Sequence, residues 1–138
     1  GAEMAEMILK EMKFPDDKIK SVAYAIKVHR HSKNIKAETI EAQILQDADR
    51  LDALGAITIA RMFCTSGELQ RPLYNPDIPI NDRSVTFYTS TIHGFYRKIF
   101  RITPESFNTE EARRIAKDRY QYVKDFVERF LKEWKGEI

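Results

Sequence analysis

The 138-residue sequence is long enough for one domain with a single hydrophobic core, and too short to predict two. Its 23 basic and 21 acidic residues give a formal net charge of +2 at pH 7, which argues against a general binder of nucleic-acid polymers. The one cysteine, Cys64, excludes an internal disulfide, and no apolar run could cross a membrane, so we expect a cytoplasmic protein without a membrane partner.

The first half of the sequence predicts three helices. Residues 2–12 carry methionines and an isoleucine on one side, which is typical of a short amphipathic helix. Pro15 and the two aspartates after it favour the start of a second helix, which we expect to run to about residue 31. From about Glu38 to Phe63, apolar side chains occupy nearly every side of the helical projection. This pattern predicts one long central helix, which needs more covering surface than the rest of the chain offers.

The second half predicts a long loop and two further helices. Residues 66–83 contain a glycine and three prolines and should form the loop, and residues 84–101 return to a helical pattern. The last helix begins with Asn108 and Glu111, spaced as in a capping box, and keeps one apolar face until Gly136 ends it. Because no segment reads convincingly as a strand, the predicted class is all-α.

Three carboxylates in the central predicted helix are the first candidates for a functional site. Buried acids are costly unless they are paired or bind a metal. Asp49 and Asp52 are three apart and share a helix face, and Asp49 falls in a stripe of alanines that a metal or ligand could approach. Asp47 falls on a bulky apolar stripe, where it would need a partner. Spacing alone leaves open that Arg50 and other bases only neutralise these acids in internal salt bridges.

Histidines and cations supply further candidates. His29 and His31 lie at the end of the second predicted helix, where an imidazole near a carboxylate-bearing helix suits a divalent metal. Because they are two apart, at most one should face a shared site, and either could simply complement the helix dipole. His93 is isolated among aromatic residues, where packing is the alternative. Candidate phosphate binders, each of which could also be a surface or salt-bridge residue, are Arg50, Arg61, Arg71 and Lys98.

Residues 44–57, ILQDADRLDALGAI, continued by Ile59-Ala60-Arg61, closely resemble the late motif of small bacterial and archaeal HD-domain phosphohydrolases. Weaker similarity elsewhere extends the resemblance over essentially the whole chain. It implies an all-α HD-domain helical bundle over residues 1–138. It also implies a divalent metal, Mn²⁺ first and Mg²⁺, Fe²⁺, Ni²⁺ or Zn²⁺ as alternatives, held by a histidine, a His-Asp pair and a later aspartate. The implied reaction is hydrolysis of (deoxy)nucleoside triphosphates to monophosphate and pyrophosphate.

The same resemblance implies roles for individual residues. Asp49 matches the later aspartate and would bind the metal. Asp52 would orient a neighbour or a metal-bound water molecule and assist as a base. His31 would lie near the site as a further catalytic group, either behind the metal ligands, in contact with phosphate, or as an extra ligand. The substrate, a nucleotide or other small phosphoester, would be bound by Lys33, Arg50, Arg71, His93 and Lys98.

The sequence departs from the family pattern because the first histidine and the His-Asp pair have no counterpart in it. We therefore expect the domain to be N-terminally incomplete, with further helices supplying those ligands and covering the central helix. Two alternatives remain open. One is a catalytically inactive helical domain that binds a nucleotide, and the other is a protein-interaction bundle with salt-bridged aspartates. A homodimer is compatible with the under-covered core.

Overall fold

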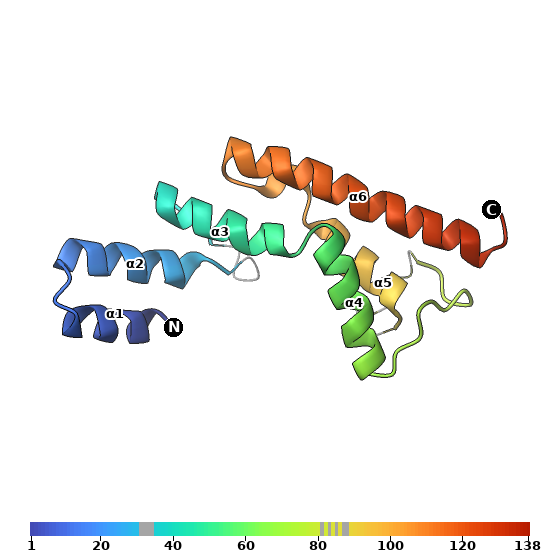
Figure 1. Cartoon of the computed structure of the whole chain (residues 1–138), viewed down its shortest axis with the longest axis horizontal. Helices are drawn as coiled ribbons and strands as arrows, with labels where there is room; N and C mark the ends of the chain where they lie inside the picture. The colour runs from blue at the N-terminus through green and yellow to red at the C-terminus, as the bar shows by residue number, and fades with distance from the viewer. Residues whose placement is uncertain (31–34, 81, 83, 85, 87–88) are drawn as a thin grey trace.

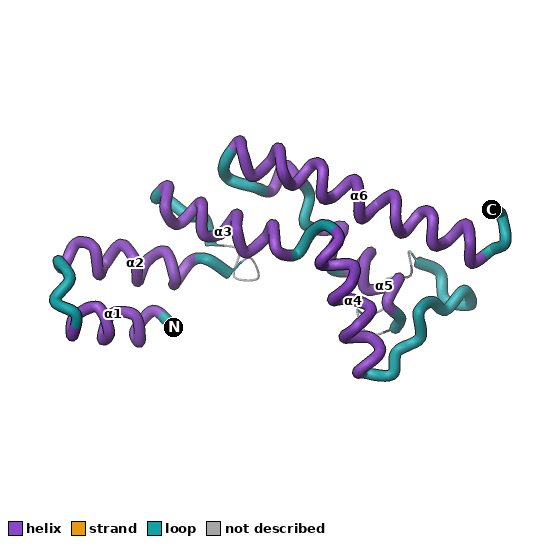
Figure 2. Tube along the Cα trace, in the orientation of Figure 1, coloured by secondary structure: helices purple, strands orange, loops and turns teal. Residues whose placement is uncertain are grey.

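The computed structural model describes residues 1–30, 35–80, 82, 84, 86 and 89–138. Within these residues the chain is helical with no strand (Figures 1 and 2), which confirms the predicted all-α class. The α-helices are α1 (Ala2–Glu11), α2 (Asp16–Val28), α3 (Ile40–Asp52), α4 (Ala56–Glu68), α5 (Thr91–Arg97) and α6 (Glu110–Trp134). Two short 3-10 helices, η2 (Ile99–Arg101) and η3 (Pro104–Ser106), lie between α5 and α6. No helix in the described ranges combines the length and apolar character that a membrane span requires.

The helices α1 and α2 form an antiparallel pair at one end of the molecule (Figure 1), and α2 also packs on α3. Pro15 caps α2 in an extended conformation ahead of two acidic residues, as its sequence predicts. A small buried cluster joins α2 to α3 and consists of Ala25, Val28, Ala37 and Ala42. Helix α1 buries no residue, and its Met4 and Met7 are each 61% exposed. This end of the molecule therefore contributes little hydrophobic core.

The single long helix predicted for residues 38–63 is wrong, because the chain breaks into α3 and α4. Gly55 adopts φ +87°, a left-handed conformation that favours glycine, and a Cβ added there would lie 3.3 Å from Cγ of Arg119. The guanidinium of Arg119 also donates a hydrogen bond to the carbonyl of Leu51 at 3.0 Å. Contacts with the distant helix α6 thus accompany the break, and α4 leaves α3 at a steep angle (Figure 1).

The main hydrophobic core lies where α4, α5 and α6 meet. Phe95 of α5 is completely buried, and its ring centroid is 6.2 Å from that of Phe63 and 6.5 Å from that of Phe126. Helix α6 is capped by Thr109, whose hydroxyl accepts a hydrogen bond from the Ala112 amide, one residue later than the predicted cap. This core holds the segment that follows α5 firmly against α6.

Helix α5 is shorter than the helix predicted for residues 84–101. It begins after Ser90, whose hydroxyl accepts a hydrogen bond from the backbone amide of His93, and ends at Arg97. The preceding loop docks on its first turn, because the amides of Thr91 and Ile92 donate to the carbonyls of Pro72 and Leu73, each at 3.1 Å. The backbone amides of the first turn are therefore bound to the loop, which prevents α5 from starting earlier in the chain.

Candidate functional site

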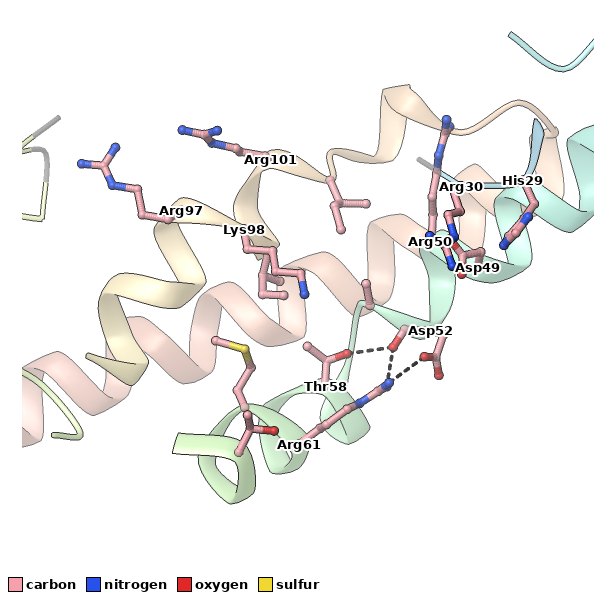
Figure 3. Close-up of a pocket in the computed structure, with 15 residues that line it drawn as sticks. His29, Arg30, Asp49, Arg50, Asp52, Thr58, Arg61, Arg97, Lys98 and Arg101 are labelled. Carbon is pink, nitrogen blue, oxygen red and sulfur yellow. Dashed lines mark hydrogen bonds and ion pairs between the residues drawn. The ribbon is translucent and has the colours of Figure 1, made fainter. Parts of the chain in front are cut away.

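A cavity of about 880 Å³ lies between the ends of α2 and α3, the first turns of α4, and the segment that joins α5 to η2 (Figure 3). Its acidic and imidazole side chains are Asp49, Asp52 and His29. Its cationic side chains are Arg30, Arg50, Arg61, Arg97, Lys98 and Arg101. Cations outnumber carboxylates in this lining, so the cavity favours an anionic ligand.

Asp49 lies on the side of α3 that opens to the cavity (Figure 3). Its side chain is exposed, and no hydrogen bond or ion pair joins it to any residue in the described part of the chain. The salt-bridge alternative therefore has no support for Asp49 among these residues. The carboxylate is available to a ligand that enters the cavity.

Asp47, two residues earlier, is bound on both oxygens. It is 2% exposed. Its Oδ1 accepts from the backbone amide of Asn108 at 2.8 Å and from the side-chain amide at 3.0 Å. Its Oδ2 accepts from the amide and the hydroxyl of Thr109, both at 2.8 Å. The expectation that Asp47 needs a partner is confirmed, and its negative charge caps the N-terminus of α6.

Gln46 is a buried residue to which the sequence assigned no role. Its Nε2 donates to the carbonyl of Val28 at 2.8 Å and to that of Ile35 at 2.7 Å, and its Oε1 accepts from Asn108 at 3.1 Å. One amide group thus ties the chain on both sides of residues 29–34 to α3. Because Gln46 precedes Asp49 by three residues, this contact sets the distance between the end of α2 and the face that carries Asp49.

Asp52 ends α3 and is clamped to α4 (Figure 3). Arg61 donates from one terminal nitrogen to Oδ2 of Asp52 and from the other to its backbone carbonyl, both at 2.8 Å. The hydroxyl of Thr58 donates to the same carbonyl at 2.9 Å. The hydrogen bond from Arg61, and then its charge, lower the pKa of the Asp52 carboxyl. This makes Asp52 a weaker base, so the geometry favours orientation of a neighbour over proton transfer.

Two of the predicted substrate-binding cations line the cavity. Lys98 is exposed at the end of α5 and extends into it (Figure 3). Arg50 is 9% exposed, and one terminal nitrogen donates to the carbonyl of Ser106 in η3. The Nε atom of Arg50 is buried without a hydrogen-bond partner among the described residues. Arg50 therefore connects α3 to η3 and retains a donor that is not used.

His93 lies apart from the cavity and is fully buried. Its Nε2 donates to the carbonyl of Ile78 at 3.1 Å, so its Nδ1 accepts from the hydroxyl of Ser90 at 2.7 Å. Its ring also stacks on Tyr74, with 5.6 Å between centroids. Because both nitrogens are used inside the protein, the contacts of His93 favour the packing alternative over substrate binding.

Three predicted site residues remain, namely Arg71, His31 and Lys33. Arg71 lies in the loop after α4 and is not among the lining residues. His31 and Lys33 lie outside the described residues.

The sequence did not single out Arg30, Arg97 and Arg101, which all line the cavity. Arg97 and Arg101 are four apart and flank Lys98, so the spacing of cations at the end of a predicted helix was a usable signal. Arg30 gave no such signal, because its placement depends on where α2 ends.

The family resemblance implies a metal ion, and the donors present fit one in part. Among the residues that the structure describes, no three histidine, cysteine or acidic side chains gather into a metal-binding cluster. The cavity does hold one free carboxylate, that of Asp49, and one imidazole, that of His29. Nitrogen and carboxylate donors suit divalent ions such as Mn²⁺ and Zn²⁺. The described residues thus offer part of a coordination set, at the position that the resemblance assigns to the later aspartate.

Several known proteins are similar to this chain. The HD domain family model matches residues 1–54. The uncharacterized protein YpgQ of Bacillus subtilis (strain 168) is 34% identical over 98 residues, which are 71% of this chain and 42% of that protein. The crystal structure of an HD-superfamily hydrolase from Bacillus thuringiensis matches with a TM-score of 0.78 at 35% identity, and covers 98% of this chain and 63% of the other.

The structure of Bacillus subtilis YpgQ in complex with ADP matches with a TM-score of 0.71 at 26% identity. That match covers 96% of this chain and 61% of the other. The chain therefore spans less than half of the curated relative and less than two thirds of these two solved chains.

Proposed function

Given that the chain belongs to the HD-domain superfamily, we propose that it forms part of a metal-dependent phosphohydrolase that acts on (deoxy)nucleoside triphosphates. The products would be a nucleoside monophosphate and pyrophosphate. One observation carries this proposal: the unpartnered carboxylate of Asp49 opens into a cavity that six cationic side chains line. The complex of the similar protein YpgQ with ADP supports a nucleotide as the ligand.

We propose Mn²⁺ as the metal, with further ligands supplied by helices outside residues 1–138. The greater length of the similar proteins supports the further helices, as do the exposed apolar side chains of α1 and α3. When bound, the metal would polarise a phosphoryl oxygen and lower the pKa of a water molecule.

The chain's own residues would bind and orient the substrate. Asp49 would hold the ion from the α3 side. Lys98 and Arg101, which both line the cavity from its α5–η2 side, would neutralise phosphate charge. Arg61, held in place by Asp52, would present its remaining N–H groups to the same anion.

The proposed compartment is the cytoplasm, because the thiol of Cys64 is free and exposed, as a reducing environment permits. The proposed partner is a small nucleotide rather than a nucleic-acid polymer. A homodimer remains compatible with the exposed apolar side chains of α1 and α3.

A catalytically inactive nucleotide-binding domain is the second candidate. The excess of cations in the cavity supports it, since cations bind phosphate whether or not a metal is present. Saturable binding of a nucleotide without product under any divalent ion would favour this candidate over the enzyme. Such binding would raise the melting temperature, because the ligand binds the native state.

The test is hydrolysis of a panel of deoxynucleoside triphosphates with Mn²⁺, using purified protein of verified intact mass and identifying the products. We expect pyrophosphate release, and a loss of at least about 100-fold in Asp49→Asn. The matched control is Asp118→Asn, which removes an exposed carboxylate of α6 outside the cavity. Equal turnover of the Asp49→Asn variant and the unmodified protein would contradict the proposal.

A further inference from the structure

Arg97 brings two unsatisfied buried donors to the cavity. Among the residues that the structure describes, the buried side-chain nitrogens without a hydrogen-bond partner are Nε of Arg50 and both Nε and Nη2 of Arg97. The two arginines line the same cavity. A buried donor without an acceptor costs free energy, and a charged one costs more, so these atoms point to a ligand that supplies the acceptors.

The two unpartnered nitrogens of Arg97 form one edge of its guanidinium. Elsewhere in the chain the same edge binds two acceptors at once. Nε and Nη2 of Arg114 donate to the two carboxylate oxygens of Glu111 at 2.9 and 2.6 Å. Those of Arg113 donate to two backbone carbonyls at 2.9 and 2.7 Å. A ligand group with two neighbouring acceptors therefore fits the edge that Arg97 presents.

The position of Arg97 indicates which part of a nucleotide would reach it. Arg97 is the last residue of α5, and Figure 3 shows it at the opposite end of the labelled group from Asp49, with Lys98 between them. Apolar side chains also line the cavity, namely those of Ala53, Met62, Ile99 and Ile102. A nucleotide whose phosphates lie near Asp49 and Lys98 would place its base, which is apolar on its faces, against this lining, with its outer edge toward Arg97.

We infer that Arg97 recognises guanine, with Nε and Nη2 donating to N7 and O6 of the base. Guanine carries these two acceptors side by side, whereas adenine has one acceptor and one donor at the same edge. Both nitrogens of Arg97 are shielded from solvent, so the half-buried side chain must turn toward the base as it binds. This inference rests on the proposed function, because it names the base of the nucleotide that the same cavity would bind.

The alternative role for Arg97 is to hold the preceding loop through Asp82. Hydrogen bonds from Ser84 lower the pKa of the Asp82 carboxyl most, and the charge of Arg97 adds a smaller lowering. Oδ1 of Asp82 accepts from the amide and the hydroxyl of Ser84, both at 2.8 Å. No hydrogen bond or ion pair joins Asp82 to Arg97, although the structure describes both residues. This attraction therefore leaves Nε and Nη2 of Arg97 unused.

The experiment measures the binding of deoxynucleoside monophosphates to the unmodified protein by calorimetry, so no hydrolysis is needed. We expect deoxyguanosine monophosphate to bind at least about 5-fold more tightly than deoxyadenosine monophosphate. Deoxyinosine monophosphate keeps N7 and O6 and should bind like the guanine nucleotide. The 7-deaza analogue of the guanine nucleotide lacks N7 and should lose the advantage. Equal binding of this analogue would overturn the inference, as would tighter binding of deoxycytidine monophosphate, whose ring also carries two neighbouring acceptors.

Variants test the contact itself. Arg97→Lys keeps the charge and removes the fork, so it should lose most of the preference for guanine. The matched control is Arg114→Lys, which removes the same fork from an exposed side chain outside the cavity and should keep the preference. Asp82→Asn should also keep it. The inference fails if Asp82→Asn loses the preference equally, or if Arg97→Lys keeps it or weakens both nucleotides alike. Backbone spectra establish that each variant is folded, and the analogue series needs no substitution.

The outcomes separate this inference from the proposed function. Hydrolysis of guanine and adenine deoxynucleoside triphosphates with equal kcat/KM, together with equal binding of their monophosphates, would overturn the inference and leave the proposed reaction intact. Selective binding of deoxyguanosine monophosphate without hydrolysis of any triphosphate would support the inference and contradict the enzyme. A protein that binds neither monophosphate would overturn the inference.

Discussion

The two ends of this molecule are held together by different interactions. Around Phe95, helices α4, α5 and α6 bury aromatic and aliphatic side chains against one another. At the other end α1 buries nothing, and Ile40 and Ile44 of α3 are 56% and 55% exposed. Burial of apolar surface is the dominant favourable term in folding, so the α4–α6 end should contribute most of the stability.

This difference extends to the candidate site, which lies where the two ends meet. Lys98 and Arg101 come from the segment packed on the main core, whereas Asp49 and His29 come from α3 and the end of α2. The end of α2 is held to α3 by the hydrogen bonds of Gln46 and by a cluster of small side chains. Helix α3 is in turn held to the start of α6 by the hydrogen bonds of Asp47. The positions of Asp49 and His29 therefore depend on a few directional polar contacts, and those of the cations depend on packing.

Truncating the centre of the main core should have the largest effect. Phe95→Ala removes a completely buried ring that contacts Phe63 and Phe126, and we expect a loss of about 3–5 kcal/mol in the free energy of unfolding. Met7→Ala in α1 should change it by less than about 0.5 kcal/mol, because Met7 is exposed. Urea denaturation measures both. Comparable losses in the two variants would show that stability is shared evenly between the ends.

Removing the carboxylate of Asp47 should have the next largest effect. Asp47→Ala leaves donors of Asn108 and Thr109 without their acceptor at the start of α6, and we expect a loss of about 3 kcal/mol. The matched control is Asp49→Ala, which removes a carboxylate two residues away that has no partner among the described residues and should cost less than about 0.5 kcal/mol. Equal melting temperatures for the two variants would contradict the structural role of Asp47.

The sequence predicted the helical class and most helix positions because apolar spacing is a local signal. It did not predict the break at Gly55, because the left-handed conformation there accompanies contacts with Arg119, a residue of α6. An apolar pattern on nearly all sides of one predicted helix instead reflects two helices that face different neighbours. Such a distinction needs the tertiary structure, as periodicity in the sequence does not contain it.

The candidate site, like the fold, was predictable only where the signal is local in the sequence. The need of Asp47 for a partner could be read from its apolar surroundings. Asn108 and Thr109 could not be identified as the partners, because the end of α3, all of α4 and all of α5 separate them from Asp47 in sequence. The choice between His29 and His31 depends on the residue at which α2 ends, and helix ends are poorly encoded by periodicity.

Removing the buried amide that joins α2 to α3 should have a moderate effect. Gln46→Leu leaves the carbonyls of Val28 and Ile35 without a donor at nearly constant side-chain volume, and we expect a loss of about 1–2 kcal/mol. The His29 ring signals should also shift, because Val28 precedes His29. The control is Gln43→Leu, which loses one bond to Ala37 and should cost about half as much. An unchanged His29 spectrum in Gln46→Leu would show that Gln46 does not position the imidazole.

The smallest effect should come from the exposed pair between Asp52 and Arg61, where α3 turns into α4. Asp52→Asn removes the charge and keeps the backbone carbonyl that Arg61 and Thr58 also bind, so we expect a loss of only about 0.2–1 kcal/mol at pH 7. Because Arg61 lowers the pKa of folded Asp52, the contribution is complete above the unfolded value near 3.8 and disappears as the pH falls through the folded value.

Urea denaturation of the unmodified protein and Asp52→Asn from pH 7 to pH 3 measures this dependence. The difference between the two proteins should be constant down to about the unfolded pKa of 3.8 and shrink below it, and 1 M salt should reduce it at pH 7. A difference that did not shrink at all below pH 3.8 would show that a contact other than the ionised carboxylate is responsible. A small, pH-dependent loss would mean that the backbone contacts and the conformation of Gly55 hold this turn, and that the charge of Asp52 chiefly orients Arg61 toward the cavity.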